Sequence, residues 1–114
     1  MPGASCMKLR DAISVLDQLP ESGTMFAERI DGQILPESRV VVLQLTEEEL
    51  NGPVAQVAGN RAPGTEYFLE ISIAKGIIEG WQSNHAGQLP VLEKALEIII
   101  YYAENDAYPP SFFG

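Results

Sequence analysis

The side chains that most often carry catalysis or bind metal ions are scarce in this chain. It contains one cysteine, Cys6, and one histidine, His85. A thiolate nucleophile needs a base at hydrogen-bond distance and a third group that orients the base, and nothing in the sequence supplies that arrangement. One His and one Cys are too few for a zinc site, and the acids lack the D-x-D-x-D-G order of a calcium loop. The sequence therefore predicts no intrinsic metal and no Cys–His catalytic pair.

Two short patterns resemble fragments of catalytic motifs. Ser72-Ile73-Ala74-Lys75 fits S-x-x-K, but the S-D-N and K-T-G motifs that complete a serine acyltransferase site are absent. Gly59 to Gly64 has the glycine spacing of a phosphate-binding loop, but Thr65 stands where the lysine should be. We therefore expect no cofactor and no enzymatic activity. A small enzyme with a pocket under the 51–65 loop is the alternative.

The charge of the chain narrows the classes of partner. Its 114 residues include 16 Asp and Glu against 7 Lys and Arg, for a net charge of −9. This charge repels phosphate backbones and anionic headgroups, so we expect neither nucleic acid nor a membrane surface as a partner. The longest apolar run, Ile98 to Ala103, is far shorter than the roughly 20 residues that span a bilayer. A single cysteine and the lack of an apolar signal-peptide core predict a cytoplasmic protein.

The outward face of the last predicted helix carries the clearest binding signal. Leu92, Ala95, Leu96, Ile99, Tyr102 and Ala103 form an inward stripe. On the same helical wheel, three glutamates fall on the outward side around a tyrosine. Such a face is either simply solvated or a docking surface for a basic protein. The candidate partner-binding residues are Glu93, Glu97, Tyr101, Glu104 and Asp106.

The end of this helix resembles a known sequence signature. Tyr101-Tyr102-Ala103-Glu104-Asn105-Asp106-Ala107-Tyr108 is similar to the C-terminal motif Tyr-Tyr-x-Glu-Asn-Asp-Ala-aromatic of a family of small uncharacterised bacterial proteins. The resemblance extends loosely to an N-terminal helix and an acidic, strand-rich middle. Small acidic bacterial proteins of this shape are often toxin-neutralising partners, so the resemblance implies an immunity or antitoxin-like inhibitor. Without the resemblance, the string is a helix terminus in which Asn105 is a left-handed cap and Tyr102 fills the core.

The N-terminal half predicts one helix and two strands. Leu9, Ala12, Ile13 and Leu16 lie at helical spacing, which indicates a helix from about Met7 to Leu19. A strand follows from Thr24 and leads to Asp31-Gly32, a pair typical of a tight hairpin turn. Arg39 to Leu45 is the most β-rich run and predicts a central strand buried on both faces. Thr46 and Glu49 have the spacing of a capping box, which predicts a short helical turn.

The C-terminal half predicts a long loop, one strand and two helices. Residues 51–65 contain several glycines and prolines, so we expect a loop there. Tyr67 to Ile71 indicates a third strand, Ser72 is placed to cap a second helix, and Pro90 suits the first position of a third helix.

These elements predict an α+β fold in a single domain over residues 1–114. We expect a small, mainly antiparallel three-stranded sheet with an N-terminal helix and two C-terminal helices on one face. The predicted function is a protein-binding module that recognises a basic partner. The alternatives are the small enzyme named above and an obligate homo-oligomer that uses Phe112 and Phe113.

Overall fold

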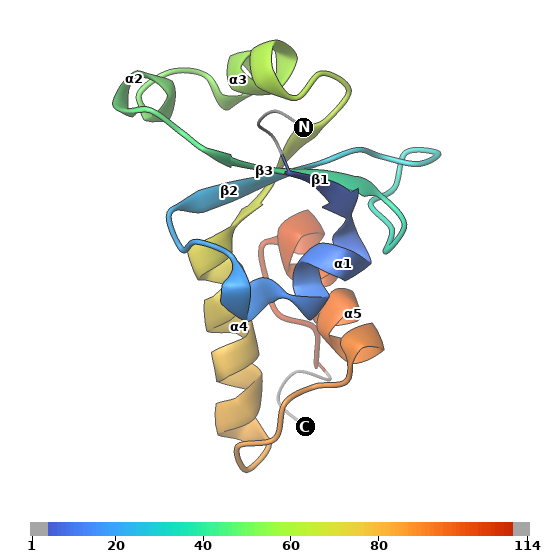
Figure 1. Ribbon diagram of the computed structural model, residues 1–114. Coiled ribbons are helices and arrows are strands. Elements are labelled where there is room, and N and C mark those ends of the chain that lie inside the picture. The colour runs from blue at the N-terminus through green and yellow to red at the C-terminus, as the bar shows by residue number, and fades with distance from the viewer. Residues whose placement is uncertain (1–4, 111–114) are drawn as a thin grey trace.

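The protein combines a sheet with helices on both of its faces (Figure 1). The computed structural model describes residues 5–110, and in that range four strands form one antiparallel sheet in the order β1-β3-β2-β4. The strands are β1 (Ser5–Lys8), β2 (Gly23–Ala27), β3 (Arg39–Gln44) and β4 (Glu66–Glu70). The helices are α1 (Leu9–Ser14), α2 (Glu47–Leu50), α3 (Val54–Arg61), α4 (Ile71–Asn84) and α5 (Leu92–Asn105), with a 3₁₀ turn η1 (Leu16–Gln18) after α1. The predicted α+β class is confirmed.

The sheet has a fourth strand that the sequence did not indicate. Met7 and Lys8, which we expected at the start of a helix, belong to β1 and pair with Val40 and Arg39. The Ser-Cys-Met-Lys segment has no β-branched residue, so its extended form comes from pairing with the valine-rich β3 rather than from local preference. The helix therefore begins at Leu9, and the predicted stripe of Leu9, Ala12, Ile13 and Leu16 is buried.

Strand β3 lies inside the sheet, between β1 and β2, as predicted. Its neighbouring residues Val40 and Val41 belong to different hydrophobic clusters, one on each face of the sheet. The predicted tight turn is also present. Asp31 and Gly32 have φ angles of 52° and 79°, and the backbones of Ile30 and Gln33 exchange two hydrogen bonds around them.

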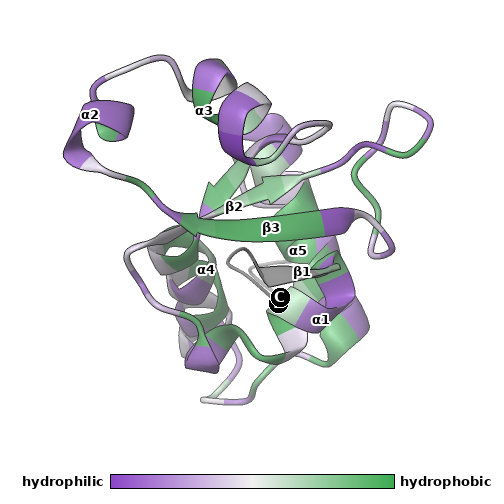
Figure 2. Ribbon diagram, turned by 45° about the horizontal axis from the view of Figure 1, so that its top comes forward, coloured by the Kyte–Doolittle hydropathy of each residue, from purple (hydrophilic) through white to green (hydrophobic). Residues whose placement is uncertain are grey.

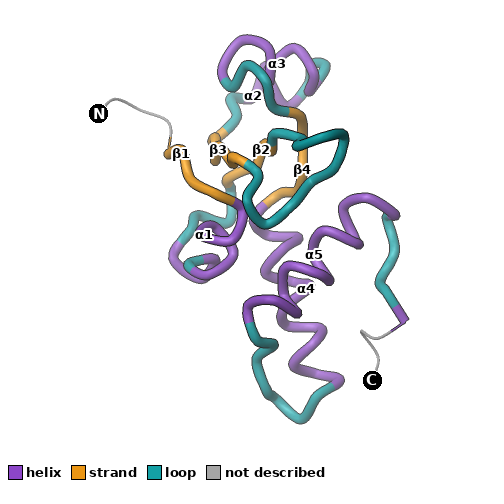
Figure 3. The backbone as a smooth tube through the Cα atoms, turned by 90° about the vertical axis from the view of Figure 1, so that its right-hand side faces the viewer, coloured by secondary structure: helices purple, strands orange, loops and turns teal. Residues whose placement is uncertain are grey.

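Two separate cores cover the two faces of the sheet. The larger one lies between the sheet and α1, α4 and α5, and its largest buried side chains include Leu9, Met25 and Ile71. The smaller one lies under α3, where Val57, Ala58 and Ala62 pack against Phe26, Val41 and Leu43. Figure 3 shows the strands between α2 and α3 on one side and α1, α4 and α5 on the other.

The second core corrects two predictions. Residues 51–65 are not a long loop, because residues 54–61 form α3, and the helices do not lie on one face only. Glycines and prolines in this segment conceal the helix, whose buried stripe among the described side chains consists of Val57 and Ala58 and continues to Ala62 at the C-cap. Figure 2 shows both hydrophilic and hydrophobic residues on α3, whereas most of the β3 ribbon is hydrophobic. Burial of that narrow stripe, rather than intrinsic preference, therefore stabilises this helix.

The last two helices form close to their predicted places. Helix α4 starts at Ile71, directly after β4, with Glu70 rather than Ser72 in the capping position. Helix α5 starts at Leu92, with Val91 preceding it. Its last residue is Asn105, and the left-handed cap falls one residue later than predicted, on Asp106 with a φ of 55°. No helix within residues 5–110 could span a membrane.

Candidate functional site: a groove along helix α5

A groove with a volume of about 490 Å³ runs along the outer side of α5. Helix α5 lines one side of it, from Leu92 to Asn105. The facing wall consists of Arg10, from α1, and the loop residues Ile34, Leu35 and Pro36. Since a helix rises about 1.5 Å per residue, the 14 residues of α5 give the groove a length of roughly 20 Å.

Helix α5 presents two parallel rows to this groove, each with a spacing of four residues. The inner row is Leu92, Leu96 and Ile100, which are partly or fully buried. The outer row is Glu93, Glu97 and Tyr101, which are exposed. Because residues four apart lie on the same face of a helix, the groove has an apolar floor from Leu92 to Ile100 and an acidic and aromatic rim beside it.

The rim glutamates Glu93 and Glu97 differ in whether they form an ion pair within the protein. Within residues 5–110, Glu93 makes no ion pair. Glu97 is 3.4 Å from Lys94 in a solvent-exposed pair one turn apart on the helix. Such pairs contribute about 0.2–1 kcal/mol, so a partner can replace this one at little cost.

Glu104, at the other end of the groove, is held by the fold. Both of its carboxylate oxygens accept hydrogen bonds from the Arg29 guanidinium, at 3.1 and 2.9 Å. The same guanidinium lies 3.0 Å from Glu66 and donates to the Gly32 carbonyl. The bonds to Glu104 and then Glu66 raise the pKa of Arg29 above its ordinary value. Glu104 therefore ties α5 to the sheet.

The cation of the facing wall is also neutralised. The guanidinium of Arg10 lies 2.7 Å from the carboxylate of Glu37, and Lys8 is 3.7 Å from the same carboxylate. The carboxylates of Glu93 and Glu97 therefore dominate the local charge along the groove, in a chain that already carries −9.

Four of the five predicted partner-binding residues line the groove: Glu93, Glu97, Tyr101 and Glu104. Asp106 does not. It terminates α5, where its N–H donates to the Tyr102 carbonyl at 2.7 Å. The pKa of Tyr67 is raised chiefly by partial burial and by the charge of Glu70, and Asp106 adds the smallest of the contributions.

The sequence did not indicate the facing wall of the groove. Ile34, Leu35 and Pro36 follow the hairpin turn by two residues and lie more than fifty residues from α5 in the chain. Their one signal is an apolar run of three residues inside a connection whose other residues, apart from Ile30 and Gly32, are polar. Only the pairing of β2, β3 and β1 brings this connection beside α5.

Two of the residues considered for catalysis, His85 and Lys75, make hydrogen bonds to backbone carbonyls. The His85 ring stacks on Trp81 with centroids 3.6 Å apart, and its Nδ1 donates to the Trp81 carbonyl at 2.9 Å. Lys75, from the S-x-x-K pattern, donates to the Leu19 carbonyl. Cys6 lies in β1, opposite Val41. In the part of the chain that the structure describes, no three His, Cys, Asp or Glu side chains gather to hold a metal ion.

Comparisons of the chain with protein-family models, with curated proteins and with solved structures found no match. The resemblance of residues 101–108 to a bacterial signature therefore stays a prediction, and the functional argument rests on the groove.

Proposed function

We propose that this protein is a protein-binding module whose α5 groove takes a basic, amphipathic segment of a partner protein. The observation that carries the proposal is the pair of rows on α5. An apolar floor flanked by exposed carboxylates is complementary to a segment with apolar anchors on one face and Lys or Arg beside them.

The shape of the groove favours a helical segment. The floor formed by Leu92, Leu96 and Ile100 is about 12 Å long and repeats every four residues, which matches the repeat of apolar side chains on an amphipathic helix. Lysine or arginine residues on the partner then lie next to Glu93 and Glu97. Tyr101 is placed to act as an anchor, since half-exposed tyrosines are frequent hot spots of interfaces.

The biological role that fits this chemistry is an immunity or antitoxin-like inhibitor of a basic partner. Its supports are the acidic charge of the chain and the resemblance of residues 101–108 to a signature of small bacterial proteins. An acidic surface accelerates association with a cationic site and masks it once bound.

The other two predicted functions gain no support from a specific observation. Residues 51–65 line neither of the two hollows described in this protein, and α3 packs down on the sheet. Phe112 and Phe113, which were the basis of the homo-oligomer, lie outside the described residues.

Selection from a phage-displayed library of random peptides tests the proposed function. The peptides should be about 16 residues long, enough to span the groove as a helix. We expect the selected sequences to be rich in Lys and Arg, with apolar residues three or four apart. Amide chemical shifts should then change along α5 and at Leu35 when such a peptide is added. Selection of acidic or neutral sequences, or shifts confined to other surfaces, would contradict the proposal.

A further inference from the structure

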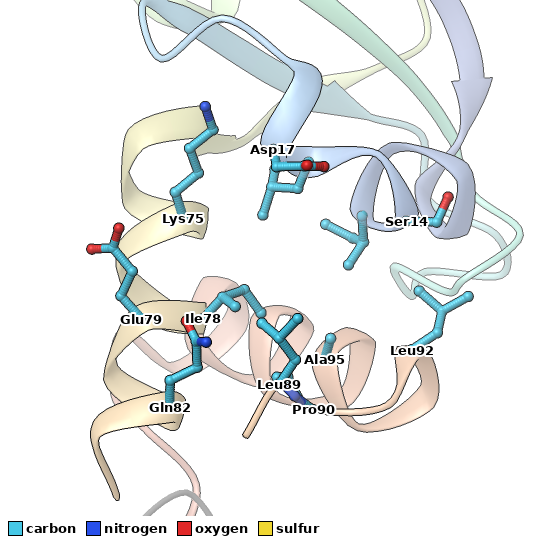
Figure 4. A pocket seen from close by; sticks show the side chains of 12 residues that line it. Ser14, Asp17, Lys75, Ile78, Glu79, Gln82, Leu89, Pro90, Leu92 and Ala95 are labelled. Atoms are coloured by element: carbon cyan, nitrogen blue, oxygen red, sulfur yellow. The ribbon is translucent and has the colours of Figure 1, made fainter. Parts of the chain in front are cut away.

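A second hollow, of about 570 Å³, lies where η1 and the end of α1 approach α4 and α5 (Figure 4). Its apolar lining comes from Ile13, Leu16, Ile78, Leu92 and Ala95. It is separate from the α5 groove, with which it shares only Leu92 among the lining residues.

The connection between α4 and α5 places exposed apolar side chains at the rim of this hollow. Leu89 and Val91 are 67% and 68% exposed, and Leu89 and Pro90 line the hollow. Large apolar side chains that protrude beside an apolar hollow mark an interaction surface more often than isolated exposed residues do.

The turn before Leu89 holds this segment in place. Ala86 and Gly87 both adopt positive φ angles, of 56° and 81°. The Gly87 N–H donates to the Gln82 carbonyl at 2.8 Å, and the Gln82 amide donates back to the Gly87 carbonyl at 3.3 Å. A segment anchored in this way loses little conformational entropy when it enters an interface.

The polar residues at the rim carry both signs of charge. Figure 4 shows Asp17 and Lys75 on the side of the hollow opposite Leu89 and Pro90. The Lys75 ammonium donates one hydrogen bond to the Leu19 carbonyl, and within residues 5–110 neither Asp17 nor Glu79 has an ion-pair partner. An apolar protrusion, an apolar hollow and charges of both signs on one rim are together what a self-complementary, two-fold contact requires.

We propose that this surface binds a second copy of the chain, so that the Leu89–Val91 segment of each copy enters the hollow of the other. The rim charges favour this occupant over a basic partner, because the rim carries the ammonium of Lys75 as well as the carboxylates of Asp17 and Glu79. Each chain carries −9, so the two copies repel each other at long range. Salt screens that repulsion while the apolar contact persists, and self-association should therefore strengthen as salt rises.

Sedimentation velocity on the full chain tests this proposal at about 0.05 M and about 0.5 M NaCl. We expect the weight-average mass to rise with concentration from 12.4 kDa toward twice that value, and to do so at lower concentration in the higher salt. The double variant Leu89→Ser, Val91→Ser should raise the dimer dissociation constant about tenfold or more, which is about 1.4 kcal/mol. Both residues are exposed, so circular dichroism should show an unchanged fold.

Leu50→Ser is the matched control. Leu50 is 65% exposed on α2, across the sheet from the hollow, and serine adds no charge at any of the three positions. Its dimerisation should equal that of the parent chain. The proposal is overturned if the parent stays monomeric at every concentration and salt. It is overturned equally if the double variant dimerises like the parent, or if Leu50→Ser weakens the dimer as much.

Discussion

Tyr101 and Tyr102 are adjacent in the chain but have different surroundings. Tyr102 packs against the larger core and against the Tyr108 ring, with centroids 5.1 Å apart, whereas Tyr101 is 39% exposed at the rim of the groove. The surroundings differ because each residue along an α-helix is rotated by about 100° from the one before it. One residue therefore supports the fold, and its neighbour is available to a partner.

Replacement of each tyrosine by alanine separates the two roles. Tyr102→Ala should lower the free energy of unfolding by about 2–3 kcal/mol, since it removes a partly buried aromatic ring. Tyr101→Ala should lower it by less than about 1 kcal/mol. Urea denaturation measures both values. A larger loss for Tyr101 would mean that the outward face of α5 is wrongly assigned.

Glu49 provides a stability prediction that depends on pH. Its carboxylate accepts a hydrogen bond from the Thr46 N–H at 2.8 Å and lies 2.7 Å from Arg61. The Thr46 hydrogen bond is the main cause that lowers the pKa of Glu49 below its usual 4.5, and Arg61 adds to it. A lowered folded pKa means that this contribution to stability is fully present above pH 4.5 and is lost as the pH falls through the folded value.

The variant Glu49→Gln tests this linkage. The parent chain should lose more stability than the variant between about pH 5 and pH 3, because only the parent has this carboxylate to protonate. Chemical denaturation at several pH values provides the comparison. Parallel stability curves for the two proteins would show that Glu49 takes up no proton on unfolding.

The ion pair of Glu104 could not be predicted from the residue pattern of α5 alone. Its place on the outward face of α5 was predictable from the helical period, but its bidentate pairing with Arg29 joins residues 75 positions apart. Asp106 was misplaced for a local reason, since the left-handed cap fell one residue later than expected and turned the chain away from the groove.

At the scale of elements, α3 packs against the face of the sheet that lies opposite α1, α4 and α5. Val57 is 5% exposed over Phe26 and Val41. Val57→Ala should lower the free energy of unfolding by about 1–2 kcal/mol, because the lost burial exceeds the gain in helix propensity. Gln56→Ala, at the preceding exposed position, should change it by less than about 0.5 kcal/mol. Equal effects in urea denaturation would mean that α3 is not packed as described.

The elements that were predicted correctly are those with strong local patterns. The stripe of α1, the valine-rich β3, the Asp31-Gly32 turn and the capping box at Thr46 all repeat or combine residues with one preferred geometry. The missed elements, β1 and α3, have weak local preferences and exist because a neighbouring strand or an apolar face lies opposite. These tertiary contacts join segments that are far apart in the chain, so a local sequence pattern does not predict them.

At the scale of the whole molecule, the two proposed surfaces should respond to salt in opposite ways. Binding of a basic segment to the α5 groove should weaken as salt rises, since the attraction between opposite charges is screened. Self-association through the Leu89–Val91 segment should strengthen. A salt titration therefore distinguishes the two surfaces without any substitution, and failure of one leaves the other standing.

The most direct test of the groove is charge reversal at its rim with a matched control. Glu93→Lys with Glu97→Lys changes the net charge from −9 to −5, and Glu47→Lys with Glu48→Lys makes the same change on exposed residues of α2, across the sheet. Calorimetric titration with a basic peptide selected on the parent chain compares the two. We predict that the groove variant binds at least about tenfold more weakly and with a reduced salt dependence, while the α2 variant binds nearly as the parent does. Equal losses in both variants would mean that net charge alone attracts the peptide, and unchanged binding to the groove variant would place the interface elsewhere.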